Sequence, residues 1–143
     1  MTYFKDADGK EWGLLLNLGT ARRVKDKLGA DLLNPNDRDK DGMPLTTRLL
    51  YDDLLLASVC EVIVDASEGE FQNFDGASLK AMDEAFWKEY RRFFAERGKD
   101  WAVKAIEADL TAREKNAQEA IKLLNGEKSS NSQDAPDAQT SNA

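Results

Sequence analysis

One segment, residues 77–97, constrains the fold more than any other part of this sequence. Its apolar side chains recur three or four residues apart, as Leu79, Met82, Phe86, Tyr90 and Phe93. That spacing places them on one face of a helix, with charged residues between them. We therefore predict a helix over residues 77–97 whose aromatic face packs against a hydrophobic core.

The first residues predict a small β-hairpin over residues 2–16. An Asp-Gly pair, Asp8 and Gly9, lies between two runs of β-prone side chains. Such a pair is a strong short-range signal for a hairpin turn. Because two strands alone are only marginally stable in water, we expect the hairpin to pack on a helix.

Three further helices are predicted, at about residues 20–28, 47–66 and 100–124. The first has Thr20 as its N-cap and Gly29 as its left-handed stop. The second is apolar on most of its circumference, so it should be the most buried. The last has one apolar face, and its second half either docks on the core or projects as a partner-binding arm.

Together these elements predict a mainly α (α+β) fold, with an N-terminal β-hairpin packed on a bundle of about four helices. A chain of 143 residues with 41% hydrophobic residues suits one core, so we expect a single compact domain over residues 1–124. Residues 125–143 have alanine as their only apolar type and no aromatic residue. They predict a disordered polar tail.

The composition excludes several kinds of chemistry. The chain has no histidine and one cysteine, Cys60, which excludes histidine-based triads, Cys-His nucleophiles and the usual zinc sites. Cys60 lies in an apolar run with no basic neighbour, which favours a buried structural thiol. With 27 acidic and 20 basic residues and a net charge of -7, the surface should repel nucleic acid. We expect a protein without enzymatic activity.

No association with a membrane is expected either. The first residues meet a charge at Lys5 and contain no apolar segment of the kind found in signal peptides. The longest apolar segment, residues 49–64, includes Asp52, Asp53 and Glu61, and it is too short and too charged to span a bilayer. These features predict a soluble cytoplasmic protein.

An acidic segment, residues 34–44, matches the first half of an EF-hand calcium loop. Its matching residues alternate and end in glycine, namely Asp37, Asp39, Asp41 and Gly42. If Asp37 is position one, the closing glutamate at position twelve is replaced by Arg48, whose charge would repel calcium. We therefore predict a solvated surface turn. Weak Ca²⁺ binding by Asp37, Asp39 and Asp41 is the alternative.

The order of the elements resembles that of a known protein family. The patterns F.D..GKEW.L.L, A.RV...LG.DLL and LL.D.LLL..V follow one another, and a segment ending in FF completes them, over residues 3–94. In these features the chain resembles the small tail assembly chaperones of long-tailed (siphophage-type) bacteriophages. The DxDxDG loop and the long final helix depart from the family pattern.

The resemblance implies a small, acidic, mainly helical protein in the host cytoplasm. It would coat the hydrophobic helices of the tape-measure protein until tail-tube subunits polymerise around them, and it would be absent from the finished particle. A longer frameshifted form is often made in such families. The implied partners are the tape-measure protein or other tail proteins, with self-association as a further option.

A chaperone of this kind needs exposed apolar side chains and an acidic surface, but no catalytic group. The candidate client-contacting residues are Trp87, Trp101, Val103, Ile106 and Leu110. They are chosen because a helix bound in a groove uses such spacing. The alternative is that the same side chains close the core.

The sequence is also compatible with three alternative functions. A structural virion connector or tail-completion protein would share the small acidic composition. A calcium-responsive interaction module would use the acidic loop, although Arg48 argues against it. A metal-dependent hydrolase would need an organised phosphate cradle, and the sequence contains no P-loop.

Overall fold

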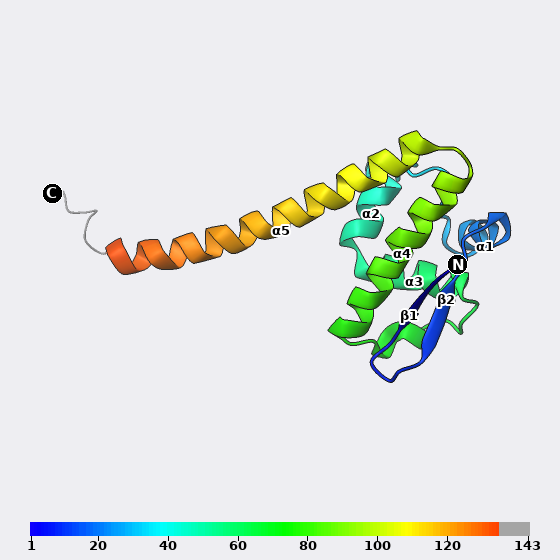
Figure 1. The fold of residues 1–143 in the computed structure, drawn as a ribbon, viewed down its shortest axis with the longest axis horizontal. Helices are drawn as coiled ribbons and strands as arrows, with labels where there is room; N and C mark the ends of the chain where they lie inside the picture. The colour runs from blue at the N-terminus through cyan, green and yellow to red at the C-terminus, as the bar shows by residue number, and fades with distance from the viewer. Residues whose placement is uncertain (135–143) are drawn as a thin grey trace. The chain divides into compact units, whose positions relative to one another are not determined.

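The computed structural model describes the backbone of residues 1–134 and the side chains of residues 1–126. The elements follow in the order β1 (Thr2–Lys5), β2 (Glu11–Leu14), α1 (Leu18–Leu28), α2 (Leu45–Tyr51), α3 (Asp53–Ile63), a 3-10 helix η1 (Glu70–Asn73), α4 (Gly76–Glu96) and α5 (Asp100–Asp134) (Figure 1). The chain divides into two units, residues 1–109 and 110–143. The predicted mainly helical fold with an N-terminal hairpin is confirmed.

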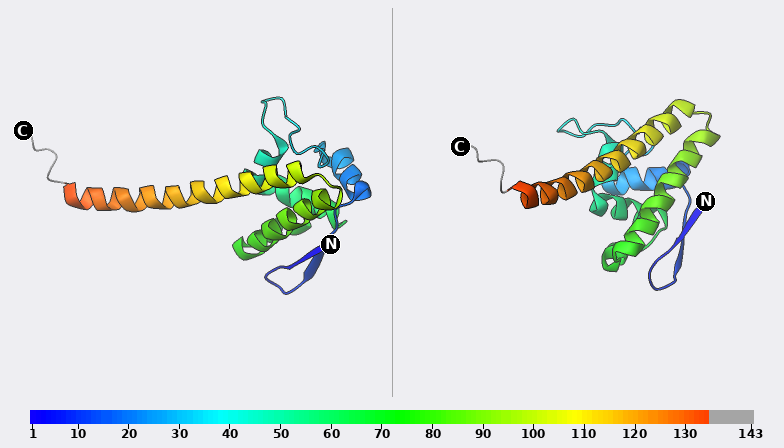
Figure 2. Two further views of the ribbon diagram at one scale, coloured as in Figure 1. Left: turned by 45° about the horizontal axis from the view of Figure 1, so that its top comes forward. Right: turned by 60° about the vertical axis from the view of Figure 1, so that its left-hand side comes forward.

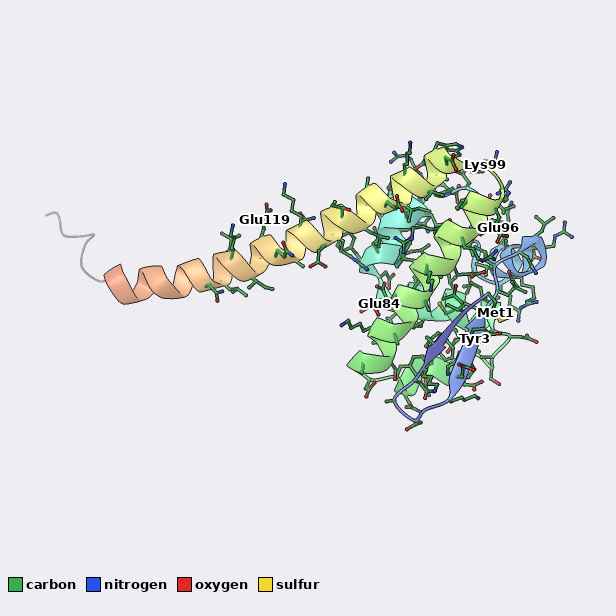
Figure 3. The ribbon with its side chains drawn as sticks, in the orientation of Figure 1. Met1, Tyr3, Glu84, Glu96, Lys99 and Glu119 are labelled. Atoms are coloured by element: carbon green, nitrogen blue, oxygen red, sulfur yellow. The ribbon has the colours of Figure 1, made fainter. Side chains whose placement is uncertain are left out.

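The hairpin forms where the Asp-Gly pair predicted it. Strands β1 and β2 are antiparallel, with Phe4 opposite Trp12. The turn is held by the Asp6 carboxylate, which accepts hydrogen bonds from the N–H groups of Asp8 and Lys10. β1 packs along α4, as both views of Figure 2 show. Tyr3 of β1 and Glu84 of α4 lie at the surface of this contact (Figure 3).

Helix α4 supplies most of the aromatic core of the first unit. Its largest fully buried side chains are Phe86, Trp87, Tyr90 and Phe94. Neighbouring rings pack edge-to-face or tilted, with the Phe86 and Tyr90 centroids 5.2 Å apart, an arrangement that aromatic quadrupoles favour. The Tyr90 hydroxyl donates to the carbonyl of Leu32 at 2.7 Å. The spacing of apolar residues over 77–97 thus correctly predicted a helix with a buried aromatic face.

Two helices, α2 and α3, occupy the segment predicted as one helix over residues 47–66. The break is at Asp52, whose φ of -118° and ψ of 94° are extended. Its N–H still donates to the Arg48 carbonyl, while its carboxylate accepts from the N–H of Leu55. A single aspartate therefore ends one helix and caps the next.

Helix α1 begins earlier than predicted, because its N-cap is Asn17 and not Thr20. The Asn17 side chain accepts from the Thr20 N–H, and the Thr20 hydroxyl accepts from the Asn17 N–H. These reciprocal bonds form a capping box. The helix ends at Gly29, whose φ of 72° is left-handed, as predicted.

Helix α5 continues past its predicted end at residue 124, to Asp134. Part of the predicted disordered tail is thus helical, and residues 135–143 lie outside the described part of the chain. The first unit ends at Asp109, earlier than the predicted domain boundary at residue 124. Among the described residues, no helix combines the length and apolar character needed to cross a membrane.

Candidate functional site

The acidic loop is a closed turn with internal hydrogen bonds. One oxygen of Asp39 accepts from the N–H groups of Asp41 and Met43, each at 2.9 Å. The Arg48 Nε lies 3.7 Å from the other Asp39 oxygen. The Met43 N–H, then that of Asp41 and the charge of Arg48, hold the pKa of Asp39 below its ordinary value. Asp39 is therefore ionised and already engaged within the loop.

The three aspartates of this loop do not converge on a common point. In the part of the chain that the structure describes, no three acidic or cysteine side chains are grouped as metal ligands. Arg48, which stands where a calcium loop needs glutamate, also donates to the Asp37 carbonyl at 3.3 Å. The geometry thus gives the arginine a structural role, because it contacts both Asp37 and Asp39.

Two of the five predicted client-contacting residues, Trp87 and Ile106, are buried. Trp87 is 2% exposed and its indole N–H donates to Asp83 at 3.2 Å, while Ile106 is fully buried. Trp87 lies off the main apolar stripe of α4, yet its side chain is as buried as those on the stripe. Both side chains are thus covered by the protein itself, and a client cannot reach them in this conformation.

The other three predicted residues are accessible. Trp101 in the first turn of α5 is 57% exposed, and Val103 is partly exposed. Leu110, the first residue of the second unit, is also partly exposed. These residues stay predicted contacts with a partner. Further along α5, the second unit exposes large apolar side chains at Ile121, Leu123 and Leu124.

A hollow beside α3 was missed by sequence reasoning. It has a volume of about 330 Å³ and is bordered by Leu54 and Ala57 of α3, by Phe71 and Phe74, and by Leu79 of α4. Leu54 is 82% exposed, the largest exposed fraction among the large apolar side chains described. The apolar sequence on both sides of Leu54 predicted that its side chain would be buried. Only the helix break at Asp52 leaves Leu54 in the first, open turn of a new helix.

A second hollow, of about 340 Å³, continues along the same face of α3 toward Leu28 and Lys27 of α1. Ser58, Glu61 and Glu68 border both hollows. Glu61 is buried, and its two oxygens accept from the N–H groups of Gly69 at 3.1 Å and Phe71 at 2.7 Å. Its carboxylate therefore fixes the backbone of residues 69–71 beside α3.

The chain was compared with known protein families, curated proteins and solved structures. No family model, curated protein or solved structure matches it.

The described side chains include a buried thiol and several exposed apolar residues. Burial raises the pKa of the Cys60 thiol, so it is protonated at neutral pH and a poor nucleophile. The exposed apolar residues include Leu54 and Trp101. Exposed apolar residues that are bordered by polar residues often mark a site of interaction with another protein.

Proposed function

We propose that this chain is a non-enzymatic tail assembly chaperone that binds the helical tape-measure protein of a long-tailed bacteriophage in the host cytoplasm. The observation that carries the binding role is the exposure of large apolar side chains on helices, among them Leu54 and Trp101. The resemblance over residues 3–94 supports the choice of client. Under this proposal the chain keeps the client soluble until tail-tube subunits enclose it.

The charge of the chain supports a solubilising role. A client with long apolar helices aggregates when its apolar faces meet. A bound protein with a net charge of -7 covers such a face and adds like charges to each complex, which then repel one another. Neither step requires a catalytic group.

The test is co-expression with the long helical protein encoded in the same tail gene cluster. We expect the tagged chain to raise the soluble fraction of that protein and to co-purify with it. Recovery should be equal in calcium and in chelator, because the guanidinium of Arg48 already lies beside Asp39. A client that stays insoluble and does not co-purify would reject the chaperone.

Purified phage particles separate this proposal from a structural role. A chaperone leaves before the particle is complete, so mass spectrometry of particles should not detect the chain. A connector or tail-completion subunit would be present in a fixed ratio to other tail proteins. Detection at such a ratio would replace the chaperone by the structural function.

A further inference from the structure

We propose that the two hollows along α3 form one groove, called here the α3 groove, that binds an amphipathic helix with basic flanks. The groove is bordered by Leu54, Ala57, Ser58 and Val62 on α3, with Leu28 at one end and Leu79 at the other. The proposal rests on the proposed function only for naming the tape-measure protein as the source of that helix. The chemistry of the occupant follows from the groove itself.

The spacing along α3 fits a helical occupant. Leu54, Ser58 and Val62 are four residues apart, so they lie on one face over about two turns, or about 12 Å. A helix that packs into such a groove presents apolar anchors at i, i+3 or i+4, and i+7. The strongly exposed Leu54 would pack between two of these anchors.

The charge around the groove selects the flanks of the occupant. Asp53 and Glu68 are exposed at its border, and Lys27 is the one basic residue among those bordering either hollow. Lys and Arg beside the apolar anchors would complement Asp53 and Glu68. Acidic flanks, including those of a second copy of this acidic chain, would be repelled.

A small polar ligand fits the groove less well than a helix. Sites for such ligands place several polar groups around an enclosed cavity. Here the buried carboxylate of Glu61 is already paired with the N–H groups of Gly69 and Phe71. The side chains left at the surface of the groove are mostly apolar, and they suit the apolar face of a helix.

The first experiment measures fluorescence anisotropy of two labelled synthetic helical peptides with the full-length chain. Both peptides carry leucine at i, i+4 and i+7, and the flanking positions are lysine in one and glutamate in the other. We expect the lysine peptide to bind at least about tenfold more tightly, with an affinity that falls as salt rises. Equal binding of the two peptides would overturn the proposal.

Leu54→Asp and Leu18→Asp form a matched pair of variants. Both leucines are exposed in the first turn of a helix, Leu18 at 65% and Leu54 at 82%, and aspartate is favourable in a first turn. Both variants should therefore stay folded, as circular dichroism and thermal melting would verify. Leu54→Asp should weaken the lysine peptide at least about tenfold, whereas Leu18→Asp should change it less than about twofold. Equal effects of the two would place the binding surface elsewhere and overturn the proposal.

Glu68→Lys and Glu84→Lys test whether charge beside the groove affects peptide binding. Both variants change the net charge of the chain by the same amount. Glu84 is exposed on α4 (Figure 3), and it is not among the residues that border the groove. Only Glu68→Lys should weaken the lysine peptide and strengthen the glutamate peptide. Identical effects of both variants would show that net charge alone acts, which would contradict a defined groove.

The outcomes distinguish this proposal from the proposed function. Binding of the lysine peptide through Leu54, without co-purification of the tape-measure protein, would retain the α3 groove and reject the client. Co-purification that Leu54→Asp leaves unchanged would retain the chaperone and reject the groove. Self-association that Leu54→Asp abolishes, without peptide binding, would assign the surface to a second copy and overturn the proposal.

Discussion

At the scale of single residues, Glu89 and Arg92 connect the N-terminal hairpin segment to α4. The Glu89 carboxylate accepts from the Leu16 N–H and from the Thr2 hydroxyl, each at 2.8 Å. Arg92 pairs with Glu89 and donates to the Leu16 carbonyl at 3.2 Å. Both backbone polar groups of Leu16 are thus bound by one ion pair on α4, which fixes the hairpin to the helix.

Replacing Glu89 by glutamine should lower stability in a pH-dependent way. Burial acts to raise the pKa of Glu89, but hydrogen bonds from Arg92, Leu16 and Thr2 outweigh it and hold the pKa below its ordinary value of 4.5. The carboxylate therefore contributes stability above about pH 4.5, and this contribution is lost as the pH falls through the lower folded pKa. We expect Glu89→Gln to cost about 2 kcal/mol near neutral pH, measured by urea unfolding.

The pH series supplies the control for this variant. The difference in unfolding free energy between the wild type and Glu89→Gln should shrink as the pH falls from about 5 to 3. A difference that stays constant over this range would contradict an ionised, hydrogen-bonded Glu89.

Truncation to alanine should lower the free energy of unfolding strongly at Trp87 and very little at Trp101. Trp87 is in the core, so Trp87→Ala should cost about 3–5 kcal/mol in unfolding free energy. Trp101 is mostly exposed, so Trp101→Ala should change it by less than about 0.5 kcal/mol. Chemical unfolding of both variants checks this. A large loss of stability in Trp101→Ala would show that its exposed indole is part of the fold.

At the scale of secondary structure, the junction between α2 and α3 depends on the Asp52 side chain. Its carboxylate accepts the Leu55 N–H at 3.1 Å and so satisfies a free donor at the start of α3. The same junction places Leu54 in an exposed first turn, at one end of the α3 groove. A local cap therefore determines which leucine of the apolar run faces solvent.

Asp52→Ala should destabilise the protein by about 1 kcal/mol, because alanine cannot accept the bond from the Leu55 N–H. Asp52→Asn is the matched control, since asparagine caps about as well and removes only the charge. Thermal unfolding followed by circular dichroism measures both. If the two variants lose the same stability, the charge at Asp52 matters and the cap does not.

Sequence periodicity predicted those elements whose signals are local. The aromatic stripe of α4 and the Asp8-Gly9 turn depend on neighbouring residues, and both were identified. The break at Asp52 was missed, because an apolar run on both sides of an aspartate has the pattern of one buried helix. The cap becomes visible only when the Asp52 side chain is seen to bond to Leu55.

The candidate site was less predictable, because the exposure of a side chain depends on which helices and strands pack against its helix. Trp87 was predicted as a contact residue, yet it is 2% exposed. Leu54 was not singled out, although it is 82% exposed. Neither result can be read from spacing alone, since spacing identifies a face of a helix and not its neighbours.

At the scale of the whole molecule, the core belongs to the first unit. All buried side chains among residues 1–126 lie between Phe4 and Ile106, within the unit that ends at Asp109. The second unit contributes exposed apolar residues, among them Ile121 and Leu124. Stability and this part of the apolar surface are thus encoded in different stretches of the chain.

Ending the chain after Asp109 should leave a cooperatively folded protein. The deletion removes none of the buried side chains described, so the unfolding free energy should change by less than about 1 kcal/mol. Urea unfolding of the truncated and full-length chains, followed by tryptophan fluorescence, measures this change. A truncated chain without a cooperative transition would show that residues beyond Asp109 are needed for folding.

The contact between Arg92 and Leu16 also has a consequence for synthesis. The two residues are 76 positions apart, so at about 5–20 residues per second about 4–15 s pass between their addition by the ribosome. Throughout that interval the hairpin has no α4 to pack on, and its strand edges can pair with those of neighbouring nascent chains. The speed of translation from Leu16 to Arg92 thus sets how long each new chain is exposed to this kind of aggregation.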